Sequence, residues 1–162
     1  FDPSWFAPGI DIAERLRRQS AAKTDRRLRY VTRGYLDFLA AGGRLRFLDL
    51  SRRLIHGLLR RGLPILTGLS STFLYRVARE HGPDDTPDDI RGAPAGHFVI
   101  ISGYNRNKRT LLINDPYGQN QEYWCNIDRV INAILLGIVT YDSNLLVIHP
   151  PNADSRHSRE KL

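Results

Sequence analysis

The chain has 162 residues, a formal net charge of +7 and a single cysteine. This length suits one globular domain with a sizeable core, and the lone cysteine excludes an internal disulfide framework. No stretch approaches the roughly 20 apolar residues that cross a bilayer, and the first residues show no part of a signal peptide. We therefore expect a cytoplasmic protein without membrane association. The chain has no methionine, so we also expect a processed form or a piece of a longer protein.

The first 62 residues are predicted to be mainly helical, because apolar residues recur there at the spacing of an amphipathic helix. Capping residues and glycines indicate three helices: one after Pro8-Gly9, one from Thr24 or Asp25 to Gly42-Gly43, and one from Asp49 or Ser51 to Gly62. Leu45-Arg46-Phe47 alternates between apolar and charged side chains, which predicts a short strand between the second and third helices.

Most of the later elements are predicted to be strands. Apolar runs bounded by turn residues indicate strands at residues 63–69, 97–104, 109–115, 121–124 and 144–148. Residues 70–80 are predicted as extended chain running into a turn of helix, and residues 81–95 as a polar loop. A further helix is predicted from Asn126 or Asp128 to Gly137. Helices followed by strands indicate one α+β domain over residues 1–150, with helices packed on an antiparallel sheet, and a flexible tail at residues 151–162.

The positive charge raises the possibility of nucleic-acid binding. Most of the basic excess falls in residues 15–61, whereas residues 84–89 are acidic. The aromatic residues nearest the arginines, Tyr30 and Tyr35, do not recur often enough for a base-stacking surface. A solvated, arginine-rich surface explains the charge better, so nucleic-acid binding ranks last among the functions considered.

One β-hairpin carries the candidate catalytic residues, with His97 beginning its first strand and Asp115 closing its second. A turn of odd length at residues 105–107 pairs Tyr104 with Lys108. In that register His97 lies opposite Asp115, with Cβ atoms about 5 Å apart, whereas an even turn puts the two on opposite faces. A histidine oriented by a carboxylate is the base half of a nucleophilic catalytic site. Because both strands are apolar on consecutive residues, we expect both faces of their sheet to be covered.

The residues around this hairpin follow a recognisable pattern. Gly-His-Phe-Val-Ile-Ile-Ser-Gly-Tyr occupies residues 96–104, and Asn-Asp-Pro occupies residues 114–116. Arg-Gly-Leu-Pro-Ile-Leu precedes them at residues 61–66, and Asp-Arg-Val-Ile-Asn-Ala-Ile follows at residues 128–134. Together these segments resemble the peptidase C39-like family of the papain-like cysteine peptidase superfamily, over about residues 55–150.

The resemblance implies a papain-like fold and thiol-dependent hydrolysis or acyl transfer at a peptide or other amide bond. It implies His97 as the general base and Asp115 as the residue that orients it. In this family a cysteine precedes the histidine at the start of a helix, with a glutamine before it that helps form the oxyanion hole. Here the lone cysteine, Cys125, follows Asp115, and Gln19 precedes no nearby cysteine.

We therefore expect this chain to be inactive alone, with a peptide or amide as its substrate. The nucleophile would come from a missing N-terminal segment or from a second chain. The alternative is a catalytically inactive relative that binds peptides or has a regulatory role.

Other candidate sites are weaker. Cys125, beside Trp124, is better explained as a small thiol packed in the core. Ser70-Ser71 lacks the final glycine of a nucleophile elbow. The histidines show no metal-ligand spacing, so neither a metal nor a cofactor is expected. Tyr104 and Tyr117 could line a substrate cleft or pack within the hairpin.

Overall fold

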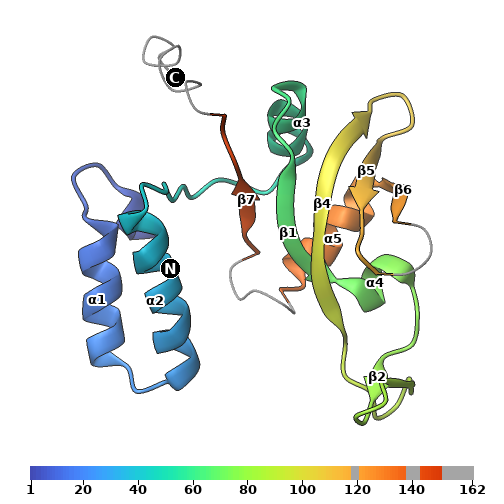
Figure 1. Ribbon diagram of the computed structural model, residues 1–162, viewed down its shortest axis with the longest axis horizontal. Helices are drawn as coiled ribbons and strands as arrows, with labels where there is room; N and C mark the ends of the chain where they lie inside the picture. Colours follow the sequence, from blue (N-terminus) through green and yellow to red (C-terminus); the bar gives the residue numbers. More distant parts are fainter. Residues whose placement is uncertain (118–120, 138–142, 151–162) are drawn as a thin grey trace. The chain divides into compact units, whose positions relative to one another are not determined.

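The computed structural model describes residues 1–117, 121–137 and 143–150 (Figure 1). Its contacts divide the chain into two compact units, Phe1–Asp49 and the part from Leu50 onward. Each unit is described by itself, and one domain over residues 1–150 stays a prediction. The tail expected at residues 151–162 lies outside the described residues.

The first unit is helical, as its apolar spacing predicts. It contains the short 3-10 helix η1 (Pro3–Phe6), α1 (Ile12–Ala22) and α2 (Arg26–Ala40). A carboxylate caps each of the two longer helices: Asp11 accepts a hydrogen bond from the backbone N–H of Glu14 at 3.1 Å, and Asp25 accepts one from that of Arg27 at 2.8 Å.

The strand expected at residues 45–47 is wrong, because this segment has no regular secondary structure. A strand needs a neighbour to satisfy its backbone groups, and none of the described strands pairs with this segment.

The second unit is built on a five-stranded antiparallel sheet in the order β6-β5-β4-β1-β7 (Figure 1). Its strands are β1 (Ile65–Ser70), β4 (Gly96–Asn105), β5 (Thr110–Asn114), β6 (Glu122–Asn126) and β7 (Leu145–Val147). Its helices are α3 (Arg52–Arg60), α4 (Ser71–Tyr75) and α5 (Ile127–Leu135). A small hairpin, β2 (Glu80–His81) with β3 (Thr86–Pro87), lies within the predicted polar loop. The predicted α+β class, with helices and an antiparallel sheet, is confirmed.

One face of this sheet packs against α5 to form the core. The fully buried side chains there come from the strands (Ile65, Leu69, Val99, Ile101, Leu111 and Ile113) and from α5 (Ile127, Val130 and Ile134). Burying each such side chain contributes about 1.5–3 kcal/mol. The core thus fixes β4 and β5, which carry the candidate catalytic residues, against a rigid helix.

The opposite face of the sheet differs from the expectation that both faces are covered. Phe98 and Ile100 point to this face and are 48% and 43% exposed, and Trp124 on β6 is 52% exposed. The buried apolar residues of α3, α4 and α5 all join the core cluster instead. Apolar residues at consecutive positions therefore do not mark a strand that is covered on both sides here.

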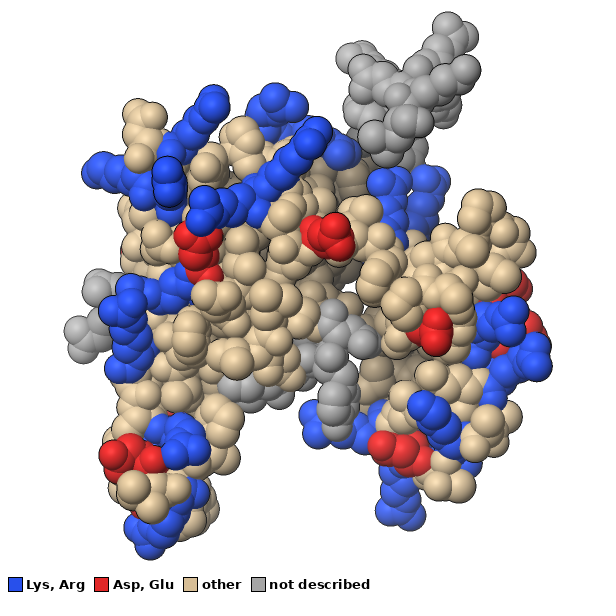
Figure 2. Space-filling view, turned by 180° about the vertical axis from the view of Figure 1, so that it is seen from behind, with Lys and Arg blue, Asp and Glu red and all other residues tan. Residues whose placement is uncertain are grey.

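Basic side chains are scattered over the visible face of the molecule in Figure 2, with acidic and uncharged residues between them. None of the described helices has the length and apolar character that crossing a membrane requires.

Candidate active site

A β-bulge in β4 decides which face His97 occupies. Ile101 pairs with Ile113, whereas Gly103 pairs with Leu112, so Ser102 is an extra residue in β4. Side chains alternate along a strand, and an extra residue therefore reverses which side chains share a face across the pair.

The predicted pairing of Tyr104 with Lys108 is wrong, because Tyr104 pairs with Leu111 and the turn contains four residues, 106–109. The side chain of Asn105 stabilises this turn by accepting a hydrogen bond from the backbone N–H of Lys108 at 3.0 Å. An even turn alone would place His97 and Asp115 on opposite faces. The extra residue of the bulge shifts the register by one residue, so both side chains lie on the core face.

The structure brings the two predicted residues together. Nε2 of His97 lies 2.9 Å from Oδ1 of Asp115. The side chain of His97 is 23% exposed, whereas that of Asp115 is fully buried. A carboxylate beside Nε2 favours the histidine tautomer in which Nε2 carries the proton. Nδ1 then keeps its lone pair. Within the described residues, Nδ1 has no hydrogen-bond partner. The imidazole therefore has one nitrogen anchored and the other available to a further group.

Three tyrosines hold the Asp115 carboxylate. The Tyr75 hydroxyl donates to Oδ2, and the Tyr123 hydroxyl donates to the same oxygen at 2.8 Å. The backbone N–H of Tyr117 donates to Oδ1 at 3.0 Å. Burial opposes ionisation of Asp115, but these hydrogen bonds and the nearby His97 outweigh it, so its pKa lies below the ordinary value of 3.8. Asp115 is therefore a carboxylate at neutral pH, despite its burial.

The same carboxylate acts on the tyrosine hydroxyls. Burial, and then the hydrogen bond to Asp115, raise the pKa of Tyr75 and of Tyr123 well above the ordinary range. Both hydroxyls therefore stay protonated and remain donors.

Aromatic rings restrict the position of the His97 imidazole. The ring of Tyr75 lies 5.8 Å from it, and the ring of Tyr117 lies 5.6 Å from it. The Tyr75 hydroxyl is also 3.1 Å from Nε2. Tyr75 reaches this position from α4, which Thr72 ties to the start of β4 by accepting a hydrogen bond from the backbone N–H of Ala95 at 2.8 Å.

Two of these tyrosines, Tyr75 and Tyr123, were not predicted from the sequence to lie at the site. Tyr123 shares the core face of β6 with Cys125, so strand alternation was an available signal for it. Nothing in the local sequence marks Tyr75. Of the two tyrosines that were expected to line a cleft or pack, Tyr117 lies against His97, whereas Tyr104 packs against the core and the ring of His56 at 4.7 Å.

The lone cysteine is a core residue. Cys125 pairs with Leu111 across β5 and β6 and is 7% exposed. Burial raises the pKa of its thiol, which disfavours the thiolate that a nucleophile requires.

Ser70 and Ser71 are buried as well, and Ser70 caps α4 by accepting a hydrogen bond from the backbone N–H of Phe73. Across the described ranges, no group of His, Cys, Asp and Glu side chains is arranged to hold a metal ion.

Comparison with known proteins gives one match. A model of the Peptidase_C39 like family matches residues 31–134, which is more than half of the chain and includes His97 and Asp115. No curated protein and no solved structure shows a significant match to the chain.

Proposed function

Because the chain belongs to the Peptidase_C39 like family, we propose that His97 and Asp115 act as general base and orienting carboxylate in a thiol-dependent enzyme. The reaction would be hydrolysis or acyl transfer at a peptide or other amide bond. The contact of 2.9 Å between Nε2 of His97 and Oδ1 of Asp115 carries this proposal. It anchors one imidazole nitrogen on a buried carboxylate and leaves the other for a nucleophile.

The proposed reaction follows from this geometry. Nδ1 of His97 accepts the proton of a cysteine thiol, and Asp115 stabilises the resulting imidazolium. The thiolate sulfur attacks the amide carbonyl carbon and forms a tetrahedral intermediate. His97 then gives its proton to the amine, which leaves as the carbon–nitrogen bond breaks, and a thioester remains. Water or an acceptor amine attacks the thioester and loses a proton through His97, which regenerates the thiol.

The nucleophile in this proposal is a cysteine other than Cys125. Cys125 is the lone cysteine of these 162 residues, and it is packed in the core with a raised pKa. The nucleophile would therefore come from a segment outside the 162 residues or from a second chain.

The test is amide hydrolysis by the full-length encoded protein, measured on a library of short peptides by mass spectrometry. We expect cleavage or transfer that iodoacetamide abolishes, together with a thioester adduct on a cysteine other than Cys125. Activity that survives iodoacetamide would contradict the proposal. A full-length protein without a second cysteine, and with no partner that supplies one, would support the inactive peptide-binding or regulatory module instead.

A further inference from the structure

A second concave region lies beside α4 and α5. It is an open pocket of about 870 Å³. Phe73, Val77 and Leu136 form its apolar part and are 41%, 54% and 53% exposed. None of the residues that hold the Asp115 carboxylate lines it. The pocket is therefore a different site from the His97–Asp115 pair.

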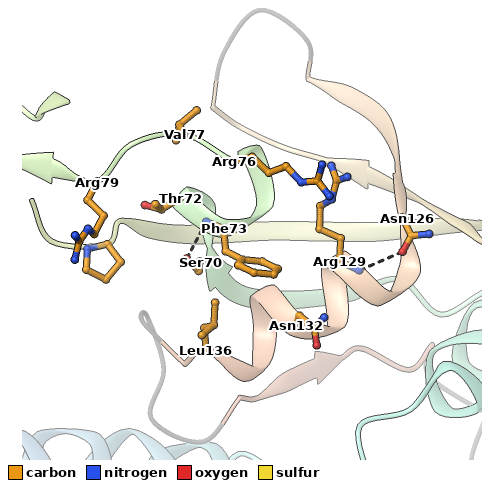
Figure 3. Close-up of a pocket in the computed structure, with 11 residues that line it drawn as sticks. Ser70, Thr72, Phe73, Arg76, Val77, Arg79, Asn126, Arg129, Asn132 and Leu136 are labelled. Carbon is orange, nitrogen blue, oxygen red and sulfur yellow. Dashed lines mark hydrogen bonds between the residues drawn. The ribbon is translucent and has the colours of Figure 1, made fainter. Parts of the chain in front are cut away.

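Two arginines from different elements meet at this pocket. Arg76 follows α4 and Arg129 lies in α5, both line the pocket, and in the view of Figure 3 their side chains point toward one another. No Asp or Glu is found among the described residues that line the pocket. The acidic residue of α5, Asp128, is paired elsewhere, because Nη2 of Arg52 lies 2.5 Å from its Oδ2. Two neighbouring positive charges repel each other, and an anion held between them offsets that repulsion.

Each arginine also has a distinctive local environment. Nε of Arg129 is buried and has no hydrogen-bond partner among the described residues, and a buried donor without a partner destabilises the fold. Arg76 has a φ of 59°, in the left-handed region that glycine usually occupies after a helix. This conformation ends α4, and the backbone N–H of Arg76 donates a hydrogen bond to the carbonyl of Thr72.

We propose that this pocket binds an organic oxyanion, with a carboxylate or phosphate group held between Arg76 and Arg129. An apolar part of the ligand lies against Phe73 and Leu136. The planar guanidinium fork matches both carboxylate and phosphate oxygens, and Asn132 on α5 adds an amide at the pocket wall. This site goes beyond the proposed peptide chemistry and does not depend on it, since it uses none of the same side chains.

The test is isothermal titration calorimetry on the 162-residue chain with three probes. N-acetyl-leucine carries a carboxylate, phenyl phosphate carries a phosphate, and N-acetyl-leucinamide is neutral. We expect saturable binding of at least one anionic probe and none of the neutral probe. The stronger of the two anionic probes identifies the source of the oxyanion. If neither anionic probe binds, or the amide binds as well as the acid, the proposal is wrong.

Variants locate the binding. Arg76→Asn removes the guanidinium and keeps a residue that tolerates the left-handed backbone, and we expect it to weaken binding about tenfold or more. Arg106→Gln, in the exposed β4–β5 turn, removes the same charge and should change affinity less than about twofold. If Arg76→Asn does not fold, Arg129→Lys is the second variant. It keeps the positive charge but lacks the guanidinium, and it should also weaken binding about tenfold. Unchanged affinity in the folded variants would overturn the proposal, and the His97–Asp115 site would be unaffected.

Discussion

Replacing His97 with glutamine in the full-length protein should lower the turnover of an amide substrate by about 10²–10⁴-fold, the range typical for loss of a general base. Glutamine keeps a polar side chain of similar size but cannot accept the thiol proton at neutral pH. Because Nε2 of His97 contacts Asp115 at 2.9 Å, the substitution also removes the charge-stabilised imidazolium. Initial rates at saturating substrate measure this effect on kcat.

His81→Gln is the matched control, because His81 lies exposed in β2 and contributes nothing to the site. Its turnover should equal that of the parent protein. Equal turnover of His97→Gln and the parent would rule out His97 as the base. A loss that His81→Gln shares would indicate a general effect of the substitution and not a catalytic one.

Asp115→Ala should lower the free energy of unfolding by about 3–5 kcal/mol, as is typical when one partner of a buried charged network is removed. The substitution leaves the hydroxyls of Tyr75 and Tyr123 and the backbone N–H of Tyr117 without their acceptor. Asp115→Asn keeps an acceptor oxygen, so its free energy of unfolding should fall by less. Urea unfolding followed by circular dichroism gives both values.

The pH dependence of stability adds a second observable. Folding lowers the pKa of Asp115, so the unfolded state binds its proton more readily than the folded state. The stabilisation by Asp115 is fully present above its ordinary pKa of 3.8 and is lost as the pH falls through the lower folded-state value. The parent should thus lose stability more steeply than Asp115→Asn as the pH is lowered from about 5.

Asp128→Asn serves as the comparison for both measurements. Asp128 pairs with Arg52, but its side chain is 45% exposed, and exposed ion pairs contribute little to stability. We expect a much smaller loss of stability than for either Asp115 variant. A loss for Asp115→Ala no greater than that for Asp128→Asn would contradict the assignment of Asp115 as the centre of a buried network.

Capping residues made the starts of three helices predictable from the sequence. Asp25, Ser51 and Asn126, each one of two candidates, cap α2, α3 and α5. Capping is a local interaction between a side chain and the nearest backbone N–H groups, so it can be read within four residues. The strand expected at residues 45–47 failed because strand pairing is not local.

The register of the hairpin was harder to predict. The contact between His97 and Asp115 was expected from an odd turn, but it arises from an even turn and the bulge at Ser102. Gly103 was the available signal: a Cβ there would lie 3.0 Å from Cβ of Leu112, so only glycine fits this close approach without adjustment. Glycine inside a strand pattern is typical of a bulge.

The tyrosines around Asp115 show the limit of reading the site from the hairpin alone. Tyr75 comes from α4 and Tyr123 from β6, and each meets Asp115 only after the sheet and its helices have packed. Their contribution to the pKa of Asp115 depends on that packing and on burial. The contact of His97 with Asp115 was expected from the hairpin, whereas the contact of Tyr75 with Asp115 was not.

The pairing of His97 with a cysteine is tested most directly by the rate of iodoacetamide alkylation across a pH series, followed residue by residue with mass spectrometry. Alkylation reports the thiolate fraction and needs no knowledge of the substrate. We predict that the full-length protein, with any partner that supplies the nucleophile, has a cysteine whose thiol pKa lies well below that of a free thiol. In His97→Gln that pKa should return to the ordinary value, while the buried Cys125 stays unmodified in both proteins. Ordinary pKa values for every reactive cysteine, unchanged by His97→Gln, would contradict the proposed pairing.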